Sequence, residues 1–364
     1  MPDFDIAIVG AGIAGASLAA ECAAHARVLL LEAEDTPGYH TTGRSAAFWE
    51  ECYGGPEIVP LTLASGPYLR DHGFLSPRGA LYIAGADGRL ALDAFVERFA
   101  ATGATIERID RQAMLAKVPG LQEGWTDAVW EPLCSDIDVA GLHQHYLTRA
   151  RRDGALLECR ARVVQATRQS GDWHIVSADR RAWTAALLVN AAGAWADQLA
   201  QMAGARPLGI QPLRRTILQL QTDPAPLPDQ PLVLDMGGRF YFKPEAGRVW
   251  LSPHDEEPSP PCDAAPEELA VAEAIDRFEH VVDWQVKRIE RKWAGLRSFA
   301  PDRLPVYGHD LRCEGFFWFA GQGGYGIQTA PAAAKLAARQ LLGLASDGVT
   351  ETLDAGLYNP ARFG

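Results

Sequence analysis

Three glycines near the N-terminus have the spacing of a phosphate-binding turn. Gly10, Gly12 and Gly15 lie between an apolar stretch and an alanine-rich one, and Glu32 ends the next apolar stretch. In such a turn the first glycine permits a tight bend, the second lets the backbone approach a pyrophosphate, and the third allows helix–strand contact. The helix N-terminus stabilises phosphate charge, and an acid at position 32 accepts hydrogen bonds from a ribose and repels the 2′-phosphate of NADP. The pattern predicts a bound dinucleotide.

Two later glycine-containing segments indicate which dinucleotide this is. Residues 41–47 read Thr-Thr-Gly-Arg-Ser-Ala-Ala and could line a flavin edge and the pyrophosphate. Residues 321–329 read Gly-Gln-Gly-Gly-Tyr-Gly-Ile-Gln-Thr, between an apolar strand and an alanine-rich helix. Their N–H groups and the helix dipole could face the flavin N1/C2=O edge, where negative charge develops on reduction. The alternative for each segment is an ordinary turn, but together they favour FAD over NAD.

Five stretches of the chain resemble the D-amino-acid oxidase (DAO) superfamily, which includes glycine and sarcosine oxidases. Within it the resemblance is closest to the bacterial D-arginine dehydrogenase type and runs over essentially the whole chain. The resemblance implies FAD-dependent oxidation of a D-amino acid to an imino acid, by hydride transfer from Cα to flavin N5. Water then converts the imino acid to a 2-oxo acid and ammonia. The stretches are residues 8–15, 43–47, 189–195, 294–298 and 321–328.

The resemblance also implies the residues that hold the substrate. An arginine fork is the best bidentate partner for a carboxylate, and Arg297 is assigned to the α-carboxylate. Arg215 is assigned as a second cation, with Tyr53 and Tyr241 as hydroxyl partners. Arg214 is the alternative to Arg215, because neighbouring residues of a strand face opposite sides.

The implied cofactor contacts are wider than the glycine turn. Sarcosine-oxidase relatives tether FAD through a cysteine in the C-terminal glycine-rich segment, but this segment has none and the nearest is Cys313. Noncovalent FAD is therefore expected, and no His/Cys cluster indicates a metal site. The expected contacts are Gly10, Gly12, Ile13, Ala14, Gly15, Glu32, Ala33, Thr42, Gly43, Arg44, Ser45, Ala46, Ala47, Val163, Ala192, Gly193, Trp195, Arg297, Gly323, Gly324, Tyr325, Gly326, Ile327, Gln328 and Thr329.

Two positions depart from the D-arginine dehydrogenase pattern. Phe48 stands where that type has a histidine, and Ala80 stands where it has the glutamate that recognises the distal guanidinium. Leaving a guanidinium unpaired in a pocket costs several kcal/mol. Together with Trp49, these residues indicate an apolar pocket for a neutral D-amino acid rather than a cationic one. Gly324 and Tyr325 are expected to complete this pocket.

Two other functions stay open. One is an FAD-dependent oxidase or dehydrogenase of glycine, sarcosine or a 2-hydroxy acid. A hydroxy acid needs a base, for which His40 and His254 are the only candidates, and a structural role is favoured for both. The other is a noncatalytic flavin-binding module, which would have no need of a carboxylate clamp such as Arg297.

The elements that must position these residues indicate an α/β protein. Strand, turn, helix and strand over the first 32 residues form a Rossmann-type βαβ unit, whereas residues 208–252 alternate polar and apolar side chains as an antiparallel sheet does. The prolines of residues 253–266 predict an exposed loop. We expect a discontinuous FAD-binding domain and a substrate domain with a mixed or antiparallel sheet, as in DAO and glutathione-reductase-like folds. Their ranges are 1–80, 140–206 and 295–364 for the first, and 81–139 and 207–294 for the second.

Composition narrows the partners and the location. A formal charge of −12 argues against nucleic acid. Six scattered cysteines without a CxxC pair fit free thiols in a reducing compartment. No run of 18 apolar residues is present, so a cytoplasmic enzyme is expected. Its partners are an amino-acid substrate and an electron acceptor, oxygen, quinone or other, that the sequence does not identify.

Overall fold

The glycine turn lies at the carboxyl end of the central strand of a largely parallel sheet. The computed structural model describes residues 1–364. Strand β1 (Phe4–Val9) pairs in parallel with β2 (Val28–Leu31) and with β12 (Ala182–Asn190), and helix α1 (Ile13–Cys22) connects β1 to β2. Every residue of β2 is buried, as expected for a parallel strand that is covered on both faces. The predicted Rossmann unit is confirmed.

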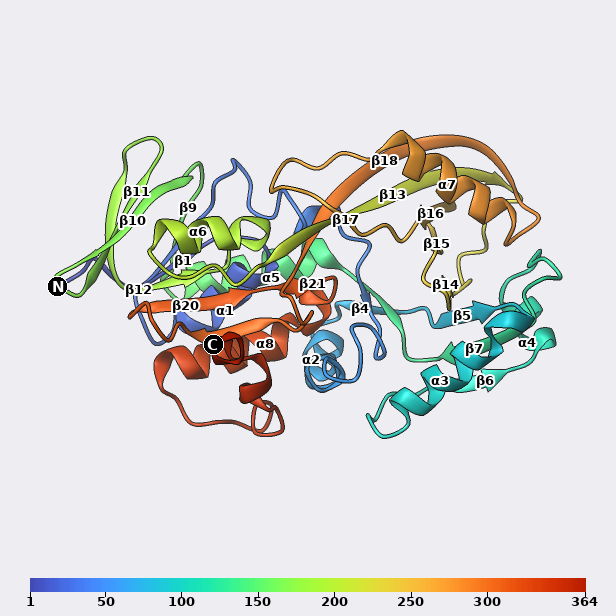
Figure 1. Cartoon of the computed structure of the whole chain (residues 1–364), viewed down its shortest axis with the longest axis horizontal. Coiled ribbons are helices and arrows are strands. Elements are labelled where there is room, and N and C mark those ends of the chain that lie inside the picture. The colour runs from blue at the N-terminus through green and yellow to red at the C-terminus, as the bar shows by residue number, and fades with distance from the viewer.

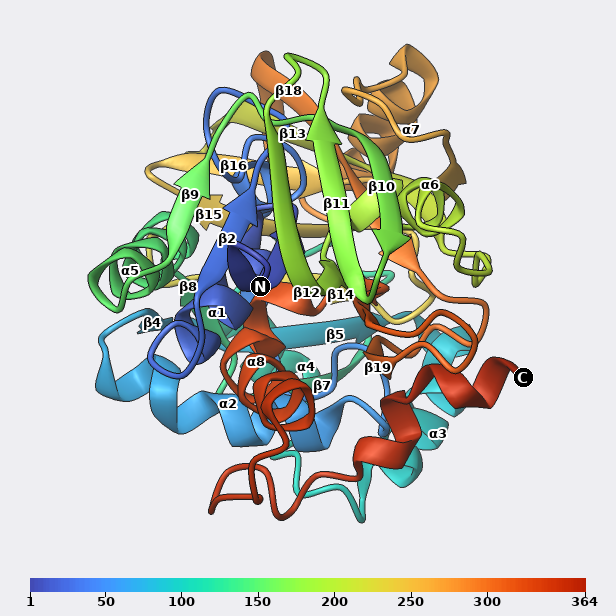
Figure 2. The same ribbon diagram turned by 90° about the vertical axis from the view of Figure 1, so that its left-hand side faces the viewer.

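The rest of this sheet comes from later parts of the chain. Its strand order is β10–β11–β12–β1–β2–β9, with β20 beside β12 and β19 beside β20, and Figure 2 shows β9, β2, β12, β11 and β10 side by side. Residues 156–169 form two strands that follow one another in the chain but lie at opposite edges of the sheet. The added strands are β9 (Leu156–Glu158), β10 (Val163–Gln169), β11 (Asp172–Ser177), β19 (Val306–His309) and β20 (Phe316–Ala320).

Helices cover both faces of this sheet. α1 packs against α5 (Val139–Arg152) and α8 (Gly326–Leu342), and their alanine-rich faces form the largest apolar core of the molecule. α2 (Val59–Asp71) packs on the outer side of α8, whereas α6 (Ala196–Met202) lies on the opposite face of the sheet (Figure 2). No helix of the chain combines the length and the apolar character needed to cross a membrane.

A second, ten-stranded sheet extends away from the first (Figure 1). Its backbone is the antiparallel pair of β13 (Gln211–Asp223) and β18 (Gln285–Phe299). β18 also pairs with β21 (Gln322–Gly323), which brings the C-terminal glycine segment against this sheet. The sheet is mixed, because β14 and β5 pair in parallel. The other strands are β5 (Ala80–Ala84), β6 (Glu107–Ile109), β7 (Asp127–Glu131), β14 (Leu232–Asp235), β15 (Tyr241–Glu245), β16 (Arg248–Ser252) and β17 (Glu257–Pro258).

Smaller elements complete the structure. A three-stranded sheet has the order β3–β8–β4 and connects the two parts of the fold. The segment 253–266, expected to be a loop, contains only β17. The remaining strands are β3 (Phe48–Trp49), β4 (Leu75–Pro77) and β8 (Ser135–Ile137), and the remaining α-helices are α3 (Arg89–Phe99), α4 (Arg111–Lys117) and α7 (Glu268–Glu279). Short 3₁₀ helices span Thr42–Arg44, Ala86–Gly88, Gly193–Trp195, Ala355–Tyr358 and Pro360–Phe363.

The two large sheets support the division into two domains that we propose from the sequence. The first sheet draws on residues 4–31, 156–190 and 306–320, and the second on residues 80–131, 211–299 and 322–323. The division expected between residues 294 and 295 falls inside the continuous strand β18. This strand therefore belongs to the second sheet up to its last residue, and its carboxyl end lies against the cofactor-binding part.

Candidate active site

A cavity of about 380 Å³ lies at the carboxyl ends of β1 and β2, where the glycine turn meets the C-terminal glycine segment. It is the place at which open α/β sheets bind dinucleotides. Most of the expected cofactor contacts line it. These are Gly10, Gly12, Ile13, Ala14, Glu32, Ala33, Thr42, Ser45, Val163, Ala192, Gly193, Trp195, Arg297, Gly323, Gly324, Gly326 and Ile327.

The glycines of the turn are required by backbone contacts that leave no room for a Cβ. Gly10 has φ +103°, and a Cβ there would lie 2.4 Å from the carbonyl oxygen of Ala191. A Cβ on Gly15 would lie 1.8 Å from the carbonyl oxygen of Gly10, so this residue allows α1 to pack on the turn and does not itself line the cavity. Gly12 at the N-cap of α1 has no side chain to cap the helix, the first turn has no acidic residue, and only the N–H of Ile13 donates to a side chain, Thr42 Oγ1 at 2.9 Å. The N-terminus of α1 can therefore receive a pyrophosphate.

Glu32 is held in the position expected for a ribose acceptor. Its Oε2 accepts a hydrogen bond from the backbone N–H of Ala11 at 3.0 Å, and its Oε1 accepts one from Glu34 at 3.0 Å. Burial raises the pKa of the Glu32 carboxyl, and these backbone N–H groups act in the opposite direction. The carboxylate is thus fixed at the end of β2, facing the cavity.

The N-terminus of α8 closes the other end of the cavity. The helix begins at Gly326 without a side-chain cap and without an acid in its first turn. Gln328 and Thr329 do not line the cavity, because their side chains turn into the protein. Gln328 Nε2 donates to the carbonyl oxygen of Glu50 at 3.1 Å and to Thr62 Oγ1 at 2.8 Å, and Thr329 Oγ1 donates to the carbonyl oxygen of Tyr325. The bonds of Gln328 fix α8 against the residue that follows β3 and against α2.

Residues 43–47 contribute less to this cavity than the sequence indicated. Ser45 lines it, but Gly43, Ala46 and Ala47 do not. The Arg44 guanidinium points elsewhere: its Nη1 donates to the carbonyl oxygens of Ala264 and Ala294, and it pairs with Asp263. Arg44, Ala46 and Ala47 line a second, smaller cavity instead.

This second cavity, of about 80 Å³, adjoins the first. Four residues, Thr41, Ser45, Arg297 and Gly324, line both. A group bound to Arg297 in the small cavity is therefore next to the large one. The other residues around the small cavity are Arg44, Ala46, Ala47, Phe48, Glu50, Tyr53, Arg215, Ile217, Leu232, Leu234, Tyr241, His254 and Gly295.

Besides Arg44, two arginines from neighbouring strands line this cavity. Arg297 is 8% exposed; its Nη1 donates to Tyr53 Oη at 2.7 Å, and its buried Nε has no hydrogen-bond partner. Arg215 Nε donates to the carbonyl oxygen of Asp255 at 2.9 Å. Burial and the charge of Arg297 lower the pKa of Arg215 to about 10, so both remain cationic at neutral pH.

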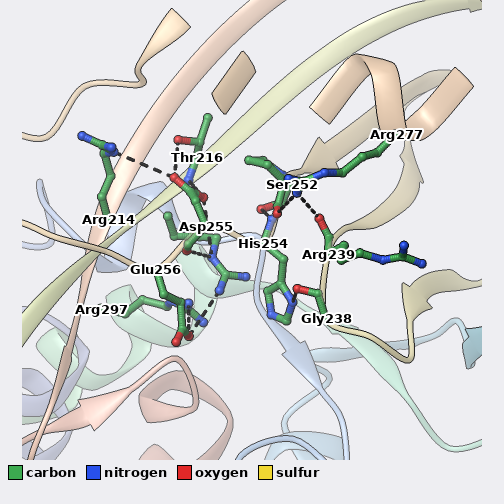
Figure 3. Close-up of polar contacts among 12 residues, drawn as sticks. Arg214, Thr216, Gly238, Arg239, Ser252, His254, Asp255, Glu256, Arg277 and Arg297 are labelled. Carbon is green, nitrogen blue, oxygen red and sulfur yellow. Dashed lines mark hydrogen bonds and ion pairs between the residues drawn. The ribbon is translucent and has the colours of Figure 1, made fainter. Parts of the chain in front are cut away.

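Glu256 contacts both guanidinium groups, and Figure 3 shows it beside Arg297. Its Oε1 is 2.7 Å from Arg297 Nη2 and 3.4 Å from Arg215 Nη2. It does not line the small cavity, so it compensates charge behind the arginines and leaves their other side open. Arg214, the alternative second cation, points to the opposite side of β13, where it pairs with Glu267.

Tyr53 and Tyr241, the expected hydroxyl partners of the substrate, both line the small cavity. Tyr325, which was also expected there, does not. A Cβ on Gly324 would lie 1.9 Å from Tyr53 Oη, so only glycine permits this contact. Burial raises the pKa of Tyr241, which therefore keeps its proton for donation. Tyr325 packs edge-on against Tyr53, with ring centroids 5.9 Å apart, and its hydroxyl donates to the carbonyl oxygen of Arg303. Tyr325 supports the wall from behind.

The residues expected to surround the side chain of the substrate in the small cavity differ from those that the structure places there. Ala80 is fully buried in an apolar cluster and does not line the cavity, and neither does Trp49, whose Nε1 donates to the carbonyl oxygen of Thr62. Sequence reasoning missed Glu50, which lines it. The available signal was an acid directly after Phe48 and Trp49, the two aromatic residues expected at the pocket.

The two histidines considered as candidate bases each line one of the two cavities. His254 lines the small cavity, and its Nδ1 is 2.9 Å from the carbonyl oxygen of Gly238 (Figure 3). Burial and the charges of Arg215 and Arg297 lower its pKa to about 3, so its ring is neutral. His40 lines the large cavity and lies 3.1 Å from Glu34.

The contacts of Gly10 generate a test of the large cavity. We expect Gly10→Ala to be purified with less than about a tenth of the flavin of the wild type, because its Cβ pushes the turn away from Ala191. Gly171→Ala is the matched control, since Gly171 also has positive φ (+96°) but no atom near its missing Cβ. The control should lose only about 1–2 kcal/mol of stability and keep its flavin. Equal flavin loss in both variants, measured by the 450 nm absorbance per protein, would contradict the assignment.

Comparisons with known proteins agree with this geometry. The model of the FAD-dependent oxidoreductase (DAO) family matches residues 5–340. FAD-dependent oxidoreductase domain-containing protein 1 of Bos taurus is 23% identical over 99% of this chain and 84% of its own length. Glycine oxidase from Geobacillus kaustophilus has a similar structure, with a TM-score of 0.85 and 22% identity over 99% of this chain and 98% of that one. L-proline dehydrogenase from P. horikoshii also has a TM-score of 0.85, with 22% identity over 100% and 98% of the two chains.

The cavity fits the cofactor of this family. Two helices direct uncapped N-termini at it, Glu32 faces its ribose end, and glycines line it where the backbone comes close. None of the six cysteines lines it. The chain belongs to the DAO family of FAD-dependent oxidoreductases, and FAD is its cofactor.

Proposed function

We propose that the protein oxidises an α-amino acid whose carboxylate is bound by Arg297. The observation that carries this proposal is that Arg297, together with Gly324, lines both the small cavity and the FAD cavity. A carboxylate bound to Arg297 would lie at the boundary between the small cavity and the FAD cavity. The carbon atom next to it could then face the FAD cavity. The bound FAD supplies a hydride acceptor at N5, and the resulting imino acid is hydrolysed by water to a 2-oxo acid and ammonia.

The residues of the chain would bind the substrate and orient it toward the cofactor. Arg297 presents a planar fork, Arg215 adds a second positive charge, and the hydroxyls of Tyr53 and Tyr241 are further donors. Such a clamp would hold the Cα–H within near-attack distance, and orientation of this kind can contribute substantially to lowering the barrier. A protein that only stored flavin would have no use for two buried cations at the cofactor boundary.

We propose a D-amino acid as the substrate. Support comes from the motifs shared with the D-arginine dehydrogenase type. The fold does not distinguish D-amino acids from L-amino acids, because a protein with the same fold is an L-proline dehydrogenase. A neutral side chain was expected because position 80 lacks an acid, but Glu50 lines the cavity. The absence of an acid at position 80 therefore no longer argues against a cationic side chain.

Glycine or sarcosine is the second candidate substrate. The observation in its favour is the volume of the small cavity, about 80 Å³, which suits a small molecule. Both have the carboxylate that Arg297 requires.

Anaerobic stopped-flow mixing tests both the proposed function and the configuration, D or L, of the substrate. We expect D-amino acids to bleach the flavin band near 450 nm and the corresponding L-amino acids and 2-hydroxy acids to leave it unchanged. Bleaching by L-amino acids alone would contradict the proposed D configuration of the substrate. A flavin that no compound reduces would show a noncatalytic module.

Substitution of the clamp tests the carboxylate site. Arg297→Lys keeps the charge but removes the fork, so the Kd of a reducing amino acid should rise about 10–100-fold, as for loss of a hydrogen bond to a charged group. Arg214→Lys is the matched control, since Arg214 lies on the other face of β13, and its Kd should be that of the wild type. A Kd unchanged in Arg297→Lys would exclude the clamp.

Acid precipitation tests the attachment of the cofactor. Because no cysteine lines the FAD cavity, trichloroacetic acid should release all flavin absorbance into the supernatant. Yellow colour that stays in the protein pellet would show a covalent bond to another residue.

A further inference from the structure

Glu50 is the only carboxylate on the wall of the small cavity. It follows β3, and its side chain is almost completely buried. The one hydrogen bond to its carboxylate comes from the hydroxyl of Tyr82 on β5, and no arginine, lysine or histidine pairs with it. A buried carboxylate normally has a cationic partner, so the missing partner of Glu50 needs an explanation.

A second buried acid lies beside it. Glu131 on β7 stands opposite Ala80 in the β5–β7 ladder and is fully buried. Its Oε1 accepts the backbone N–H of Glu51 at 2.6 Å, but its Oε2 is buried without any hydrogen-bond partner. The two acids, one from the turn after β3 and one from β7, thus form a pair without a cation.

The surroundings of this pair keep it largely protonated in the absence of a ligand. Burial raises the pKa of Glu50 to about 7, and the Tyr82 hydroxyl opposes this weakly. Burial and the charge of Glu50 raise the pKa of Glu131 above its ordinary range. The other titratable groups near the pair are Glu51, Cys52, Tyr82 and Cys134, and those on the cavity wall are Arg44, Tyr53, Arg215, Tyr241, His254 and Arg297.

Glu50 lines the same small cavity as Arg215 and Arg297 without pairing with either arginine. The charges of Arg215 and Arg297 shift the pKa of His254 and Tyr241, whereas burial and the Tyr82 hydroxyl are the causes that shift the pKa of Glu50. Arg297 lines the FAD cavity and Glu50 does not. A substrate whose carboxylate lies on Arg297 can therefore meet Glu50 with its side chain inside the same cavity, whose wall also includes the apolar side chains of Ile217 and Leu234.

We propose that Glu50, supported by Glu131 and Tyr82, is the recognition site for a cationic group at the tip of the substrate side chain, an ammonium or a guanidinium. This rests on the proposed function and specifies its substrate class. When the cation binds, Glu50 ionises and its proton leaves to solvent, so a charge-assisted pair replaces a neutral buried carboxyl. A neutral tip gains no such pair.

The preference for a cationic over a neutral side chain must therefore depend on pH. Below pH 7 the cation must expel a proton from Glu50, and each further pH unit weakens its binding about tenfold. Above pH 7 the carboxylate is already ionised and the preference becomes constant. D-lysine and D-norleucine, or D-arginine and D-citrulline, form pairs in which only the tip differs, so effects on the amino acid head cancel in the kcat/KM ratio.

The experiment measures this ratio between pH 5.5 and 9 for the wild type and for Glu50→Gln. The wild-type ratio should rise with pH and level off above about 7. Glu50→Gln should lower the ratio at pH 8 about tenfold or more, the value of a hydrogen bond to a charged group, and remove its pH dependence. Glu51→Gln is the matched control: Glu51 is a buried acid on the same turn, bonded to the Thr105 backbone and outside the cavity, and its ratio should follow the wild type.

Tyr82→Phe provides a second variant should Glu50→Gln not fold. It removes the hydroxyl that stabilises ionised Glu50, so the rise of the ratio should move to higher pH. A ratio independent of pH, or unchanged in Glu50→Gln, would overturn the inference. If no amino acid reduces the flavin, the proposed function fails; if neutral amino acids turn over without any dependence on Glu50, only this inference fails.

Discussion

Two guanidinium groups on one buried wall are the constraint on which the site depends. Arg215 and Arg297 repel each other, and burial removes the water that would otherwise screen them. Glu256 makes the arrangement possible because its carboxylate contacts both. It also contacts Arg303 at 3.0 Å, so the segment after β16 is tied to the wall of the site. Without this acid, one arginine would have to move away or lose charge, and the carboxylate clamp would not form.

The antiparallel pair of β13 and β18 places this clamp at the cofactor. Arg215 and Arg297 lie on these neighbouring strands, and β18 continues until Ser298 and Phe299 pair with β21. This short strand holds Gly323, one residue before the glycine that contacts Tyr53. The carboxylate site and the FAD cavity therefore share a continuous backbone. Their distance is set by hydrogen bonds between strands and does not depend on flexible side chains.

The sequence predicted the parts of the site that depend on local geometry. Gly10, Gly12 and Glu32 follow from the spacing of a strand, a turn and a helix, and strand alternation limited the second cation to Arg214 or Arg215. The resemblance assigned Arg215, but alternation alone could not exclude Arg214, because the choice depends on which face of β13 meets the cavity. The structure places Arg215 there and turns Arg214 toward Glu267.

The missed features depend on contacts between distant segments. Ala80 was expected on the cavity wall, but its strand packs it into an apolar core. Tyr325 was expected at the cofactor, yet its ring turns behind Tyr53. Glu50 gave no motif, since its importance arises only where β3, β5 and β7 meet. Tertiary packing decided these three positions, and no periodicity in the sequence reports it.

The small cavity combines arginines with one carboxyl group, that of Glu50. Arg297 lies on β18, which also lines the FAD cavity, so this part of the wall must stay fixed for any substrate that is oxidised there. The part that holds Glu50 is built by a turn and by strands that do not line the FAD cavity. Changes around Glu50 can therefore alter which side chain is accepted without moving the reacting carbon. In this protein the position of the reaction and the choice of side chain rest on separate elements.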